Sequence, residues 1–129
     1  MAEEQQYLKA VHSMEIGDES AKTTVAFHKL SGIGCEFDAD FAVSLLEERA
    51  KDKDSEAQWM LGLCYEYGIG TEQDMDQALT LYRRSIRAKN PIGRFIMQNG
   101  KNRRGGGALK IDKGLLSLSL SFYGVKNIQ

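Results

Sequence analysis

Proline, cysteine and long apolar runs are all scarce in this chain. A single proline among 129 residues leaves most of the sequence free to form helices. No apolar run approaches the roughly 20 residues that a membrane-spanning helix needs. The first residues also lack the apolar core of a secretory signal peptide. Two cysteines, Cys35 and Cys64, are too few for a disulfide scaffold, so we expect a reducing, cytoplasmic location.

Acidic residues are almost missing from the C-terminal part of the chain. Residues 83–129 hold eleven Lys and Arg against one acid, Asp112, which is a net charge of +10. Residues 1–82 hold six Lys and Arg against seventeen Asp and Glu, which is a net charge of −11. The overall charge of −1 hides this division. Such an asymmetry indicates electrostatic partners rather than a particular fold.

A 36-residue repeat organises the middle of the chain. Residues 21–56 align without a gap on residues 57–92 with ten identities. Chance would give about two, and self-similarity at a fixed spacing is typical of repeat architectures. We therefore divide this part of the chain into the repeat units 19–54 and 55–90, called unit 1 and unit 2.

Each unit is expected to form two helices joined by a glycine turn. Gly32 and Gly68 are placed to end the first helix of each unit in a left-handed conformation. Residues 3–16 predict a preceding outer helix, and residues 91–98 a third inner helix that stops at Asn99-Gly100. The expected N-caps of the four repeat helices are Ser20, Asp38, Ser55 and Asp74.

Unit 2 resembles the Sel-one-like repeats, relatives of the tetratricopeptide repeats. The resemblance is strong over residues 55–90, weaker over 19–54 and absent beyond about residue 93. It implies an all-α fold, a short right-handed α/α superhelix, and an adaptor that assembles other proteins without enzymatic residues. The matching residues are Ala57, Leu61-Gly62, Tyr65, Gly68, Gly70, Asp74, Ala78 and Leu81-Tyr82. The chain departs from the family pattern at Lys29, Cys35, Phe41, Thr71 and Gln77.

Residues 100–129 follow a different pattern from the helical repeat domain, which we place at 1–99. Residues 101–107 predict a basic, glycine-rich loop. Residues 115–122 alternate apolar side chains with serine, which predicts a half-buried strand. This strand could open a second domain, pair with its copy in a dimer, or pack as irregular chain over the last helices.

The sequence offers no constellation of catalytic or metal-binding residues. The two Gly-Ile-Gly triplets lack the strand and the Lys-Ser/Thr that a nucleotide loop requires. His12 and His28 have no Cys or carboxylate partners at the spacing of a metal site. We therefore expect no enzyme, no cofactor and no metal.

Aromatic side chains are the first candidates for contact with another protein. Trp59 is the only tryptophan, and it either packs in the core or anchors a partner. Phe37 and Phe41 stand where unit 2 has Gln73 and Gln77. Two aromatics in place of polar residues indicate a surface that is covered either by a partner or by residues 91–129. The aromatic candidates are Trp59, Tyr67, Phe37 and Phe41.

Arg83, Arg84 and Arg87 are the basic candidates for partner binding. The main hypothesis is a non-enzymatic, cytoplasmic adaptor that binds another protein or peptide. The alternative is a nucleic-acid-associated module that uses the basic residues within 83–104. Cations at the end of a helix also complement its macrodipole without any partner. The division of charge further allows self-association between the acidic end of one copy and the basic end of another.

Overall fold

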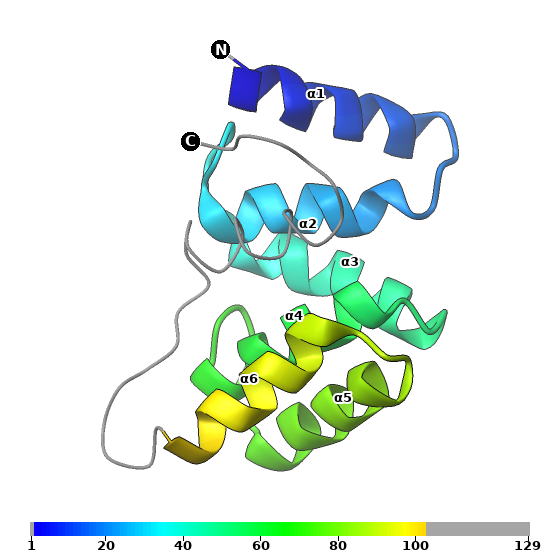
Figure 1. The fold of residues 1–129 in the computed structure, drawn as a ribbon. Helices are drawn as coiled ribbons and strands as arrows, with labels where there is room; N and C mark the ends of the chain where they lie inside the picture. The colour runs from blue at the N-terminus through cyan, green and yellow to red at the C-terminus, as the bar shows by residue number, and fades with distance from the viewer. Residues whose placement is uncertain (1, 103–129) are drawn as a thin grey trace.

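The computed structural model describes residues 2–102, and these residues form six helices and no strand (Figure 1). Each helix packs against the next along the chain, and α6 also contacts α4. The helices therefore stack from α1 at one end to α5 and α6 at the other (Figure 1). None of these six helices is long and apolar enough to cross a bilayer. Their bounds are α1 Ala2–Glu15, α2 Ala21–Ser31, α3 Ala39–Lys51, α4 Ser55–Tyr67, α5 Met75–Arg87 and α6 Pro91–Asn102.

Each repeat unit holds two helices, as expected: α2 and α3 lie in unit 1, and α4 and α5 lie in unit 2. The two flanking helices are confirmed as well, since α1 packs on α2 and α6 packs on α5. Glycines at matching positions of the two units show that α1 lies where the second helix of a preceding repeat unit would lie. The backbone of Glu3 in α1 touches Gly34, and the backbone of Ala39 in α3 touches Gly70. A Cβ atom at either glycine would collide with that backbone, so both contacts require glycine.

Aspartates and left-handed glycines set the helix ends much as expected. The Asp38 and Asp74 carboxylates accept from the backbone N–H three residues on, at 3.1 Å in both cases. Gly32 and Gly68 end α2 and α4 with φ values of 70° and 65°. These caps are therefore confirmed.

Two of the predicted caps, Ser20 and Ser55, are wrong, because an aspartate shortly before each serine accepts the hydrogen bonds instead. Ser20 makes no side-chain cap bond, and its hydroxyl donates to Asp18 Oδ1 at 2.6 Å. Asp54, and not Ser55, caps α4 by accepting from the N–H groups of Glu56 and Ala57. Asn90 caps α6 in the same way through the N–H groups of Ile92 and Gly93. Asp54 and Asn90 are one repeat length apart, so this cap belongs to the repeat.

The helix α6 continues through Asn99-Gly100 to Asn102, so the predicted stop at those residues is wrong. A glycine inside a helix costs only about 1 kcal/mol. Packing outweighs that cost, since Ile92 and Ile96 of α6 are fully buried. Lys101 and Asn102 thus belong to a helix and not to the expected loop. The remainder of that loop and the predicted strand lie outside the described residues.

The helix α4 is buried nearly all round. Gly62 lets the ring of Tyr82 in α5 lie directly against the α4 backbone. The Tyr82 hydroxyl then donates to Glu66 Oε1 at 2.7 Å, which ties the two helices together. The two helices therefore approach each other closely at Gly62.

Candidate partner-binding site

Trp59 lies in the core and not on a contact surface. Its side chain is fully buried, with its ring 5.9 Å from that of Phe27. The indole N–H donates to Glu56 Oε1 at 2.6 Å. Of the two roles considered for Trp59, core packing is the one that the structure supports, because α4 is enclosed by its neighbours. Tyr67, the other candidate in α4, is half-buried beside the glycine turn.

Phe37 and Phe41 are exposed, on either side of the cap that begins α3. Phe37 is 60% exposed and Phe41 is 38% exposed. Unit 2 builds the same turn with polar residues, and Gln73 uses its amide to donate to the Glu66 carbonyl at 2.8 Å. Gln77 is exposed. The fold therefore does not require an aromatic side chain at either position.

Lys29 lies between two aromatic rings beside this turn. Its ammonium nitrogen is 5.3 Å from the ring centroid of Tyr7 in α1 and 5.9 Å from that of Phe41 in α3. Cation–π attraction at such distances contributes about 0.5–1 kcal/mol at an exposed site, so it favours this position of the Lys29 ammonium without deciding the fold. Partial burial alone would lower the pKa of Lys29, but Tyr7, Cys35 and Asp38 together outweigh it and raise that pKa. We call Phe37, Phe41 and Lys29 together the aromatic patch.

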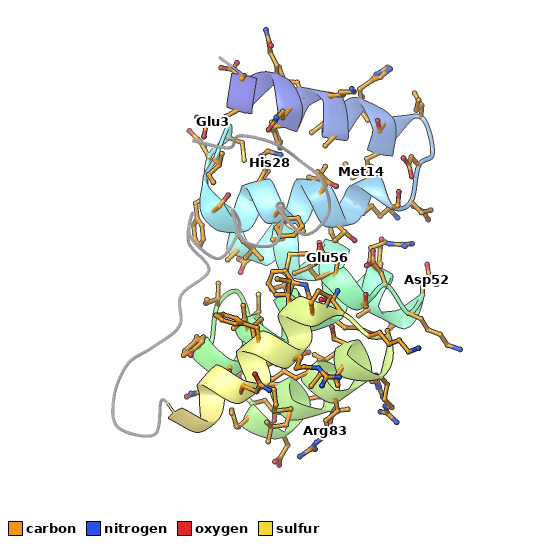
Figure 2. All side chains as sticks on the ribbon, viewed as in Figure 1. Glu3, Met14, His28, Asp52, Glu56 and Arg83 are labelled. Atoms are coloured by element: carbon orange, nitrogen blue, oxygen red, sulfur yellow. The ribbon has the colours of Figure 1, made fainter. Side chains whose placement is uncertain are left out.

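His28 is buried close to the aromatic patch, between α1 and α2 (Figure 2). Its ring meets that of Tyr7 edge to face at 5.6 Å, and its Nδ1 bonds to the Ile33 carbonyl at 2.8 Å. Burial lowers the pKa of His28 below the ordinary value of 6.5, so the neutral ring is favoured. Within the described residues no three His, Cys, Asp or Glu side chains gather as a metal site would need. His28 therefore packs against the same Tyr7 ring that Lys29 faces.

The two cysteines are free thiols in different surroundings. Cys64 lies in the core at the position of unit 2 that corresponds to His28, and burial raises its pKa to about 12. Cys35 is half-buried in the turn before Phe37, and burial raises its pKa as well. Neither thiol has the lowered pKa of a reactive cysteine.

The three predicted arginines separate in the structure. All three are exposed, but only Arg84 and Arg87 line a cavity at the end of α5. Arg83 lies outside that lining, at the α5 end of the stack (Figure 2). The cavity also gathers Lys51, Lys53 and Gln58, which the sequence interpretation missed. The one signal that could have found them is the lysine shared by both units, Lys53 and Lys89. Both have a positive φ, of 65° and 63°.

Comparison with known proteins supports the repeat and the fold. Residues 55–90 match the family model of the Sel1 repeat, which confirms the resemblance noted for unit 2. None of the curated proteins matches the chain. A protective antigen of uropathogenic Escherichia coli strains, described as displaying an SLR fold, is similar with a TM-score of 0.68 and 23% identity. A Sel1 repeat protein from Oxalobacter formigenes is similar with a TM-score of 0.65 and 22% identity.

The chain spans only part of these similar structures. The alignment covers 95% of this chain and 26% of the Escherichia coli protein, and 92% of this chain and 51% of the Oxalobacter formigenes protein. At such identities the likeness extends to the fold, and the all-α helical-repeat superhelix is therefore established for the described residues.

Proposed function

We propose that this chain is a non-enzymatic helical-repeat adaptor that binds another protein through the aromatic patch. The observation that carries the proposal is the exposure of Phe37 and Phe41 at positions where the same fold uses glutamine. Solvent-exposed phenylalanines that folding does not require are typical of contact surfaces. The Sel1 repeat match over 55–90 supports the same function class.

The patch also has the rigidity that a binding surface needs. Phe41 is held at the first turn of α3 by the Asp38 cap and faces the Lys29 ammonium. Lys29 is in turn placed against Tyr7, so three helices fix the surface before a partner arrives. A preorganised surface loses less conformational entropy on binding. Residues 91–129 were the other candidate cover for this surface, and their described part, α6, packs on α4 and α5 instead.

The test compares the proteins that co-purify with wild type and with a Phe37→Gln/Phe41→Gln variant. This variant copies unit 2, so we expect its thermal unfolding to match that of wild type. The cognate partner should fall about tenfold or more in quantitative mass spectrometry, as expected for the loss of two anchoring side chains.

Leu8→Gln is the matched control. Leu8 is similarly apolar and 53% exposed, but it lies on α1 and outside the patch. Its replacement should leave the captured partner unchanged. Equal recovery with the double variant, or an equal loss with Leu8→Gln, would show that the patch is not the contact surface.

Head-to-tail self-association is a second candidate, and the arrangement of the helices favours it. Over the described residues the stack runs from α1, which takes the place of the second helix of a repeat unit, to α6, which takes the place of a first helix (Figure 1). The acids Glu3 and Glu4 lie at the α1 end, and Arg83 and Arg94 lie at the other. A second copy could therefore continue the repeat with opposite charges in contact. Sedimentation should then show oligomers at low salt that dissociate at high salt, and a monomer under both conditions would exclude them.

A further inference from the structure

The cavity between the ends of α3 and α5 gathers four cations around one buried amide. It has a volume of about 460 Å³ and is lined by Lys51, Lys53, Arg84 and Arg87 together with Gln58. No Asp or Glu is among its lining residues. Among the described residues, the ion pairs are made by Lys22 and Arg49 and by none of these four cations. The lining itself therefore holds no acid to balance its positive charge, although Lys51 also acts on Glu48 outside the lining and helps to lower the pKa of that carboxyl.

Gln58 gives this cavity an unmet hydrogen-bonding demand. The residue is only 5% exposed, and its side-chain Oε1 has no hydrogen-bond partner. A buried polar atom left without a partner costs about 1–3 kcal/mol. Rotation of the terminal amide by half a turn presents its NH₂ group at the same place, where it can donate to an anion. A bound oxyanion would satisfy the amide and the cations together.

Unit 1 shows how the same positions look when they need no ligand. Lys22 and Glu48 occupy the places of Gln58 and Arg84, and they form an ion pair of 2.8 Å. In unit 2 the acid has become Arg84 and the lysine has become a neutral amide. The internal neutralisation of unit 1 is thus replaced by two groups that both donate hydrogen bonds to anions.

Charges at helix ends account for part of this arrangement but not for all of it. Arg84 and Arg87 lie in the last turn of α5, where a cation complements the macrodipole. That effect gives no reason for the unpartnered Gln58. It also gives no reason why Lys51 and Lys53 of unit 1 lie in the same lining. The positive φ of Lys53 belongs to the repeat itself, because Lys89 of unit 2 shares it.

We propose that this cavity binds an oxyanion carried by a peptide chain, either a carboxylate or a phosphate monoester. Arg84 and Arg87 supply forked donors, Lys51 and Lys53 supply point charges, and Gln58 supplies a buried amide. That the anion is carried by a peptide rests on the proposed function of protein binding, whereas binding of the anion itself does not.

A short anionic segment fits the charges better than a nucleic acid does. Residues 1–82 carry a net charge of −11, which repels a long polyanion running over the surface. A single acidic or phosphorylated side chain needs to reach only the cavity. Arg83, which a phosphate backbone could also use, is not among the residues that line the cavity.

The test titrates purified full-length protein with inorganic phosphate, a peptide with an Asp/Glu run, and the same peptide carrying phosphoserine. Binding should move the side-chain amide resonances of Gln58 in nuclear magnetic resonance spectra. The Gln58→Lys/Arg84→Glu variant rebuilds the ion pair of unit 1, so it should fold and lose about tenfold or more in affinity. Arg83→Glu carries the same charge change outside the cavity and should lose less than about twofold.

Each outcome decides the proposal. A higher affinity for one of the two peptides identifies the carboxylate or the phosphate as the natural group. Equal binding by the double variant and wild type, or equal losses with Arg83→Glu, would overturn the site. Tighter binding of single-stranded RNA, weakened alike by both variants, would overturn it in favour of a general basic surface. Arg87→Gln, at an exposed position, serves as the second variant if the double variant fails to fold.

These measurements also separate the two proposals. Neither the peptides nor phosphate needs Phe37 or Phe41, so failure of the cavity leaves the partner captured by the aromatic patch intact. Conversely, loss of the patch by Phe37→Gln/Phe41→Gln should leave phosphate affinity unchanged.

Discussion

Units 1 and 2 share one backbone plan but differ in which apolar side chains they expose and in which charged side chains they leave without an ion pair. The identical residues are mostly glycines of the turns, acids around the second helix and small or apolar core residues. Unit 1 exposes Phe37 and Phe41 where unit 2 has glutamines. In unit 1 Glu48 forms an ion pair with Lys22, whereas Arg84 at the same position of unit 2 forms none of the ion pairs of the described residues. Each unit therefore keeps the fold, and the two proposed binding sites lie at positions where the units differ.

The comparison teaches which positions the fold itself requires. Where both units hold the same residue, a backbone conformation or a cap explains it, as at Gly32 and Gly68. Where they differ, one unit shows what is sufficient for folding and the other shows what has been added. Predictions can therefore be framed as exchanges between the units.

The largest effect is expected at Gly62, where the two units differ in the core. Unit 1 has Ala26 and Leu46 at the positions of Gly62 and Tyr82. An added Cβ at Gly62 would lie 2.5 Å from a ring carbon of Tyr82. Gly62→Ala should therefore lower the free energy of unfolding by about 3 kcal/mol, measured by urea denaturation.

The matched control for Gly62 adds the second residue of unit 1. Gly62→Ala/Tyr82→Leu removes the collision and should recover part of the lost stability, although Glu66 then loses the hydroxyl of Tyr82. A Gly62→Ala protein as stable as wild type would mean that the close approach of α4 and α5 is not as described.

An intermediate effect is expected at Asp54, which joins the two units. Besides capping α4, its carboxylate accepts from the Thr23 hydroxyl at 2.7 Å and from Arg49 at 3.4 Å. Asp54→Ala should cost about 2 kcal/mol of unfolding free energy, because a cap and a partly buried hydrogen bond are lost together. Asp74→Ala, which removes a cap alone, should cost about 1 kcal/mol. Equal losses would show that Asp54 does not connect the units.

The smallest effect is a pH dependence that belongs to unit 1 alone. The pKa of His28 is lowered in the folded protein, so the unfolded chain takes up a proton first as the pH falls below about 6.5. The contribution of His28 to stability is complete above that pH. It is then lost at up to about 1.4 kcal/mol per pH unit, until the folded ring also protonates.

His28→Cys copies unit 2, where Cys64 occupies this position, and should remove that part of the pH dependence. Urea denaturation of both proteins between pH 7.5 and 5.5 gives the difference. A His28 resonance that titrates at or above the ordinary value of 6.5 would contradict the account.

Much of the fold could be predicted because the repeat is written at positions that the backbone constrains. Turn glycines such as Gly68 need a left-handed φ, and caps such as Asp74 need a short acceptor, so both are legible in the sequence. The end of α6 could not be predicted in this way, because the burial of Ile92 and Ile96 stabilises the helix by more than Gly100 destabilises it. Local propensity carries no information about such tertiary packing.

The candidate sites could be predicted less well, for a related reason. The exchange of glutamines for Phe37 and Phe41 is visible by aligning the units, and so the aromatic patch was found. Trp59 could be a contact or a core residue until burial was known. The cavity was missed because Lys53, Gln58 and Arg84 come together only through the stacking of α3, α4 and α5.

The most direct test of partner binding by unit 1 places a photoreactive benzoylphenylalanine at position 37 or, in unit 2, at position 73. Irradiation in cells followed by mass spectrometry identifies what each residue touches. We predict an adduct with the same partner protein from position 37 and none from position 73. Equal adducts from both positions, or an adduct from position 37 only to residues 103–129 of its own chain, would contradict the account.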